Sequence, residues 1–110
     1  MAASKNPTAR LEIFLYDEDA RVVCRLRGEL DTSTTGQLRA YLAERVAEDR
    51  DVVVDLAGVT FVDSSGLGVL VGALKRFQAE GHELTLRSPT PTLLRVLEMT
   101  GLARAFPLEA

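Results

Sequence analysis

The sequence predicts a small α/β domain with a mixed sheet of four or five strands and with helices packed mainly on one face. Two runs of alternating apolar residues near the N-terminus favour an antiparallel hairpin. Helical and strand patterns then alternate along the chain, which favours parallel pairing through right-handed crossovers. The length of 110 residues suits one compact domain.

The chain divides by pattern into a short tail and one domain. Residues 1–8 are small and polar, include Pro7 and show no periodicity, so we expect a flexible tail there. Residues 9–110 contain no internal repeat, linker or low-complexity segment. We therefore expect a single domain over residues 9–110.

The hairpin prediction rests on two alternating runs on either side of a polar turn at residues 17–20. The residues on the apolar faces of the two runs are Leu11, Ile13, Leu15, Val22, Cys24 and Leu26. Because Cys24 lies on an apolar face, we expect a buried core thiol.

The pattern becomes helical after residues 28–31. A helix is expected from about Thr34 to Ala47, and Thr34 followed three residues later by Gln37 resembles a capping box. The β-branched run at residues 51–56 then predicts a central strand that helices cover on at least one face.

Two further helices and two short strands are predicted in the second half. A helix begins near Ser64 or Ser65, and Gly81 is placed to end it. Residues 83–87 form the next strand. Thr90 followed by Pro91 predicts the start of a third helix, which stops before residue 101. A last short strand or turn is expected at about residues 103–108.

Composition excludes several classes of function. The chain has 13 Lys and Arg against 16 Asp and Glu, and this net charge of −3 argues against direct binding of nucleic acid. One Cys and one His cannot form a disulfide or a structural zinc site. The longest apolar stretch, residues 66–74, is too short for membrane insertion, and the first residues do not resemble a secretory signal. We therefore expect a cytoplasmic protein.

The segment at residues 61–68 stands out because it follows the central strand and begins a helix, where open α/β folds commonly present ligands. Asp63, Ser64 or Ser65 could cap this helix. The free N–H groups and the dipole of a helix start also favour an anion.

Small residues make the same helix unusual. Gly66, Gly68 and Gly72 each cost up to about 1 kcal/mol relative to alanine in a helix, which suggests a close approach by another group or tight packing on the sheet. Val69, Gly72 and Ala73 give the face away from the leucine stripe a small apolar character that predicts a contact surface.

Catalytic readings of this segment are poorly supported. A phosphate-binding loop and a Gly-x-Ser-x-Gly elbow are both missing from the sequence. His82, expected to be a solvated loop residue, is separated from Ser64 by about 18 Å of helix. Asp31, Asp55 and Asp63 lack the further His or Cys partners of a metal site. No catalytic residue, cofactor or metal is expected.

An exposed hydroxyl at a helix start is suited to phosphorylation. A phosphoserine adds a charge of about −1.5 to −2, which an exposed helix terminus tolerates. A docked partner that presents carboxylates would face like-charge repulsion of several kcal/mol, or at least about a hundredfold loss of affinity. Binding would change while the fold stays intact.

From about residue 10 to the end, the sequence resembles the STAS-domain anti-sigma factor antagonists of bacteria. The resemblance rests on Gly28-Glu29-Leu30-Asp31, on Val62-Asp63-Ser64-Ser65-Gly66-Leu67-Gly68-Val69, and on Thr100-Gly101-Leu102. It implies a small STAS domain, in agreement with the order of elements derived above.

The resemblance also implies a partner-switching function. In this family the unphosphorylated antagonist binds an anti-sigma factor and so frees a sigma factor. The anti-sigma factor is also an ATP-dependent serine kinase, and its target would here be Ser64. A PP2C-type serine phosphatase would restore binding. The antagonist is then a substrate and not an enzyme, and we expect a monomer.

The residues expected to contact the partner are Asp31, Asp63, Ser64, Ser65, Gly66, Leu67, Val69 and Gly72. STAS domains also occur in transporters, stress-sensing assemblies and lipid-transport systems. The alternative function is therefore a non-phosphorylated accessory or scaffold subunit of a larger assembly.

Overall fold

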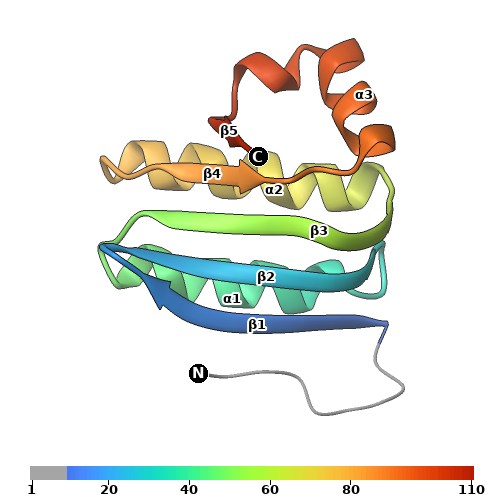
Figure 1. The fold of residues 1–110 in the computed structure, drawn as a ribbon. Helices are drawn as coiled ribbons and strands as arrows, with labels where there is room; N and C mark the ends of the chain where they lie inside the picture. The colour runs from blue at the N-terminus through green and yellow to red at the C-terminus, as the bar shows by residue number, and fades with distance from the viewer. Residues whose placement is uncertain (1–9) are drawn as a thin grey trace.

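The computed structural model describes residues 10–110, and the predicted flexible tail at residues 1–8 lies outside them. The helices and strands alternate in the order predicted from the sequence (Figure 1). In chain order they are β1 (Leu11–Glu18), β2 (Arg21–Leu30), α1 (Thr35–Ala47), β3 (Val52–Val62), α2 (Ser64–Ala79), β4 (Leu84–Arg87), α3 (Pro91–Thr100), the 3-10 turn η1 (Leu102–Arg104) and β5 (Leu108–Glu109).

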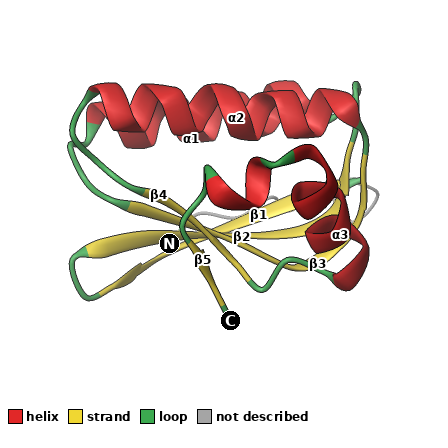
Figure 2. Ribbon diagram, turned by 90° about the horizontal axis from the view of Figure 1, so that it is seen from above, coloured by secondary structure: helices red, strands yellow, loops and turns green. Residues whose placement is uncertain are grey.

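The strands form a five-stranded sheet in the order β1-β2-β3-β4-β5. β1 and β2 pair antiparallel, and the remaining neighbours pair parallel. Helices α1 and α2 lie side by side over one face of the sheet, and α3 lies beyond β4 at the edge that β5 occupies (Figure 2). The predicted fold class is confirmed.

The hydrophobic core lies between the sheet and the helices α1 and α2. The alternating runs of the hairpin send Leu11, Ile13 and Leu26 into it with at most 1% of their surface exposed. Cys24 is fully buried as predicted, and burial raises the pKa of its thiol to about 12. This thiol is therefore a core group and not a reactive one.

Strand β3 is longer than the sequence predicted. The expected strand ended at Leu56, whereas the structure extends it to Val62. Gly58 and exposed residues after position 56 obscure the strand pattern, but register shifts in the pairing with β2 accommodate them. The extension pairs Leu30 with Val62, so that β2 and β3 end side by side.

The helix termini agree with their predicted signals at the end of α2 and at both ends of α3. The Thr90 hydroxyl accepts the Leu93 N–H at 3.4 Å, and Pro91 is the first residue of α3. Gly81 follows the end of α2 with a φ of 78°, a left-handed conformation that favours glycine. The start of α1 differs from its prediction and belongs to the site described below.

Candidate functional site

Two turns of similar sequence lie next to each other where the parallel strands β2 and β3 end. Asp31 follows β2 and Asp63 follows β3. The Asp63 N–H donates a hydrogen bond to the Leu30 carbonyl at 3.1 Å, which joins the two turns. The charge of Asp31 acts to raise the pKa of Asp63, a smaller effect than the hydrogen bonds that lower it.

Asp63 is the N-cap of α2 and organises the second turn. One carboxylate oxygen, Oδ1, accepts the Ser65 N–H at 2.9 Å, the Ser65 hydroxyl at 2.5 Å and the Gly66 N–H at 3.1 Å. The Ser65 hydroxyl and these N–H groups hold the pKa of Asp63 below its usual value. The ionised carboxylate therefore stabilises the helix start.

Ser64 differs from Ser65 although the two are adjacent. Ser64 is the first residue of α2 and is exposed, and its hydroxyl makes no hydrogen bond with any residue that the structure describes. Ser65 is half-buried and its hydroxyl is donated to Asp63. The sequence left the cap open among three residues, and the structure assigns it to Asp63, which leaves the Ser64 hydroxyl available to another molecule.

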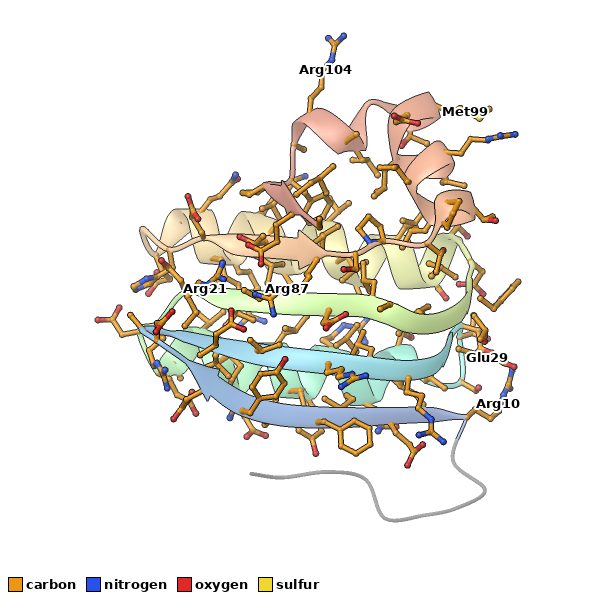
Figure 3. All side chains as sticks on the ribbon, in the orientation of Figure 1. Arg10, Arg21, Glu29, Arg87, Met99 and Arg104 are labelled. Carbon is orange, nitrogen blue, oxygen red and sulfur yellow. The ribbon has the colours of Figure 1, made fainter. Side chains whose placement is uncertain are left out.

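Asp31 organises the first turn in the same way but is more firmly enclosed. Its Oδ1 accepts the Ser33 hydroxyl at 2.7 Å and the Ser33 N–H at 2.9 Å. The Arg10 guanidinium forms ion pairs with Asp31 and with Glu29, as Figure 3 shows for Arg10 and Glu29 at this end of the sheet. The hydrogen bonds from Ser33, together with Arg10, lower the pKa of Asp31.

The predicted capping box at Thr34 and Gln37 is wrong. The Thr34 hydroxyl donates to the Glu29 carbonyl at 2.8 Å and accepts the Asp31 N–H at 3.0 Å, so it closes the turn and does not cap α1. The Gln37 amide donates to the Leu11 carbonyl at 3.2 Å. Both side chains therefore bond to residues outside α1 and not to the N–H groups at the start of that helix.

Of the glycines in α2, Gly66 is the one at which another segment approaches closely. A Cβ atom there would lie 2.9 Å from the Leu30 Cβ and 3.0 Å from the Leu30 carbonyl oxygen. At Gly68 and Gly72 a Cβ would meet no atom within 4 Å. Tight packing on the sheet therefore explains Gly66 and is the wrong explanation for Gly68 and Gly72.

Only part of the small apolar face of α2 is accessible at the surface of the protein. Val69 and Ala73 are buried in the core, and Gly66 is buried as well. Much of the predicted contact surface is therefore an internal contact, because α1 packs against α2 there. Gly72 is exposed and lies in a shallow groove between α1 and α2.

Sequence reasoning gave no separate role to Phe61, which lies two residues before Asp63. Its side chain is 53% exposed, unusual for an aromatic residue at the end of a central strand. A register shift in the pairing with β2 falls between Val59, which is buried, and Phe61, so strand alternation does not predict that Phe61 is exposed. The sequence pattern of the strand was moreover recognised only to residue 56.

His82 is far from these turns and is not freely solvated, contrary to the prediction. Its ring lies 2.6 Å from a carboxylate oxygen of Asp49 and 3.1 Å from one of Asp51, and its side chain is 21% exposed. The hydrogen bonds with Asp49 and Asp51 raise the pKa of His82. It follows α2, at the opposite end of that helix from Ser64.

Neither a metal-binding cluster nor a membrane-spanning helix occurs among residues 10–110. Within these residues, His, Cys, Asp and Glu side chains form no group of three or more suited to hold a metal ion. None of the helices described there combines the length and the apolar character that crossing a membrane requires.

Comparison with known proteins identifies the family to which this chain is similar. The family model described as the STAS domain matches residues 14–110. An anti-sigma F factor antagonist from Paenibacillus polymyxa is 32% identical over 100 residues, which cover 89% of this chain and 86% of that protein.

Solved structures share the fold as well. An anti-sigma factor antagonist from Mycobacterium paratuberculosis superimposes with a TM-score of 0.78 at 28% identity, covering 94% of this chain and 88% of that chain. The Bacillus cell fate determinant SpoIIAA in its phosphorylated form gives a TM-score of 0.71 at 28% identity, covering 89% and 90%. The match over residues 14–110 and the identity to these relatives establish that this chain belongs to the STAS domain family.

Proposed function

We propose that this chain is an anti-sigma factor antagonist whose binding is controlled by phosphorylation of Ser64. In the unphosphorylated form it binds an anti-sigma factor with serine kinase activity, and a sigma factor is released. The observation that carries the proposal is the exposed Ser64 hydroxyl beside Ser65, whose own hydroxyl is engaged by Asp63. The names of the relatives support the antagonist function, and SpoIIAA is known in a phosphorylated form.

The modification is a phosphoryl transfer in which this chain is the acceptor. The Ser64 oxygen forms a bond to the γ-phosphorus of ATP while the bond from that phosphorus to the β–γ bridging oxygen breaks. ADP leaves, and the hydroxyl proton passes to a base of the kinase. A PP2C-type phosphatase reverses the state by hydrolysing the phosphate ester, with water as the second reactant.

The consequence for binding follows from charge. Phosphate adds about −1.5 to −2 charges at a position that already has the carboxylates of Asp31 and Asp63 nearby. The start of α2 tolerates an anion, so the fold persists. A partner that presents carboxylates to this site meets several kcal/mol of like-charge repulsion.

In this scheme the protein is a regulator and substrate, and the kinase and the phosphatase carry the catalytic groups. The arrangement of the two turns supports this role, because both carboxylates are committed to N–H groups and hydroxyls of their own turns. The proposed function requires the bacterial cytoplasm, where ATP and the transcription machinery meet.

The proposal is tested by phosphorylation with the cognate anti-sigma factor kinase. After incubation with ATP, mass spectrometry should find phosphate on Ser64, and PP2C-type phosphatase should remove it. Ser64→Ala should bind the kinase permanently and accept no phosphate. Ser65→Ala is the matched control, because its hydroxyl is held by Asp63, and it should still be phosphorylated. Phosphate on Ser65, or on neither serine, would reject the proposal.

A further inference from the structure

We propose that an apolar groove next to Ser64 receives an apolar side chain of the protein that binds over Ser64. This inference rests on the proposed function and specifies where its partner is anchored. The groove has a volume of about 170 Å³ and lies between the end of β3, the start of α2, and α3. Its lining residues are Val59, Thr60, Phe61, Val62, Leu67, Thr90, Thr92, Leu93 and Val96.

The groove is lined by residues on either side of the Ser64 turn. Val62 and Leu67 both line it, and in the sequence they enclose residues 63–66, the turn that presents Ser64. A protein that covers the Ser64 hydroxyl therefore lies next to residues that line the groove. This adjacency determines the occupant that we assign to it.

Exposed apolar side chains mark the same surface. Phe61 and Met99 are 53% and 80% exposed, and with Leu108 they are the exposed large hydrophobic residues in the described part of the chain. On α3, residues four and three positions apart share one face, so Thr92, Val96 and Met99 form a single stripe. Figure 3 shows Met99 projecting outward from α3. The apolar surface thus extends from Phe61 along α3.

The chemistry of the lining selects the kind of group that it binds. None of the lining residues carries a charge, so a charged group would lose its hydration there without gaining an ionic partner. The volume is below the range of about 300–1,000 Å³ that is typical of small-molecule sites. It suits one inserted side chain, and Phe and Met are residue types enriched in protein interfaces.

The groove and Ser64 then contribute to partner binding in different ways. The groove supplies apolar anchoring that does not depend on charge, and the phosphorylation of Ser64 beside it supplies the electrostatic control. Phosphorylation expels the partner without altering the groove, because the phosphate lies on the helix start and not among the lining side chains.

Replacement of the exposed aromatic ring is the first test. Phe61→Ala should raise the Kd for the cognate anti-sigma factor kinase by at least about tenfold, as removal of a central interface anchor does. Leu108→Ala is the matched control, because Leu108 is also an exposed apolar residue but lies on β5 outside the groove. It should leave the Kd unchanged. Thermal melting of both variants verifies the fold.

A fluorescent reporter gives a second, independent reading. Cys24 is buried with a raised thiol pKa, so Met99→Cys introduces the single reactive thiol for an environment-sensitive dye. Adding the kinase should shift the emission to shorter wavelength as the partner covers the stripe. The same label on a chain that also carries Ser64→Asp should show no shift.

Two outcomes would overturn the inference. One is that Phe61→Ala binds the kinase with wild-type affinity while Ser64→Asp loses binding. This result would show that the groove does not anchor the partner, and it would leave the proposed function intact. The other is a concentration-dependent shift of the dye without any kinase, which assigns the surface to a second copy of this chain. Failure of the proposed function has a different signature, namely unaltered binding of Ser64→Asp.

Discussion

The turn after β2 and the turn after β3 have almost the same local hydrogen bonds, yet they have different roles. In each, an aspartate accepts the N–H and the hydroxyl of the serine two residues later. In the first turn, Arg10 adds an ion pair to Asp31, and the Thr34 hydroxyl is bound on two sides.

Among residues 10–110, no such ion pair forms with Asp63, and Gly66 stands at the position that Thr34 occupies in the first turn. Glycine lets the start of α2 approach Leu30 closely, and Asp63 forms its bonds within the turn. In both turns the shared motif holds an aspartate carboxylate by hydrogen bonds from the same turn. The neighbouring residues decide which turn has a structural role and which one presents an accessible serine hydroxyl.

The largest expected effect is the loss of partner binding when the second turn receives a charge. Ser64→Asp should weaken the Kd for the anti-sigma factor kinase by about a hundredfold or more, because carboxylates of the partner meet a like charge. The melting temperature should remain nearly unchanged, since an acidic residue at the first helical position suits the dipole. Titration calorimetry and thermal melting measure the two quantities.

Ser64→Asn is the matched control for that variant, because it adds polarity and size without charge. It should bind close to the wild-type level. If Ser64→Asp unfolds the protein, the serine is structural and the contrast between the two turns is lost.

The second effect concerns the close approach at Gly66. Gly66→Ala should reduce the free energy of unfolding by about 1–3 kcal/mol, because the new Cβ would lie 3.0 Å from a backbone oxygen that cannot easily move. Gly68→Ala and Gly72→Ala should instead stabilise by up to about 1 kcal/mol each, since a Cβ meets open space and alanine favours the helix. Urea denaturation would show the opposite signs, and equal signs would contradict the packing.

The smallest effect is on the acid titration of the two aspartates. Both pKa values are lowered in the folded protein, so their stabilisation is complete above the usual aspartate pKa of 3.8 and is lost as the pH falls through the lowered values. Ser65→Ala should raise the pKa of Asp63 towards its usual value, because the bond from its hydroxyl is the largest cause of the shift. NMR titration of the carboxyl groups measures this.

The pKa values of Asp31 and Asp63 should respond differently to salt in the same titration. High ionic strength should raise the pKa of Asp31 more than that of Asp63, because the Arg10 side chain is 55% exposed and its attraction is screened. An equal response of the two carboxyl groups would show that Arg10 contributes nothing to the first turn.

Much of this molecule could be predicted from the sequence because its signals are local. Alternation in the hairpin, the glycine after α2 and the Thr-Pro start of α3 each act through neighbouring residues. The candidate serine was also identified from its position in residues 61–68 after a strand. These features depend on side-chain period and on capping bonds of short range.

The sequence by itself determined the order of the elements, the mixed sheet and a serine at the start of a helix. Only the tertiary structure decided that the Thr34 hydroxyl bonds to the Glu29 carbonyl and does not cap α1, and that β3 extends to Val62. It also decided which serine hydroxyl Asp63 binds, among the residues that the structure describes. It also placed Phe61 beside α3. These features arise from contacts between residues far apart in the chain, which no local pattern encodes.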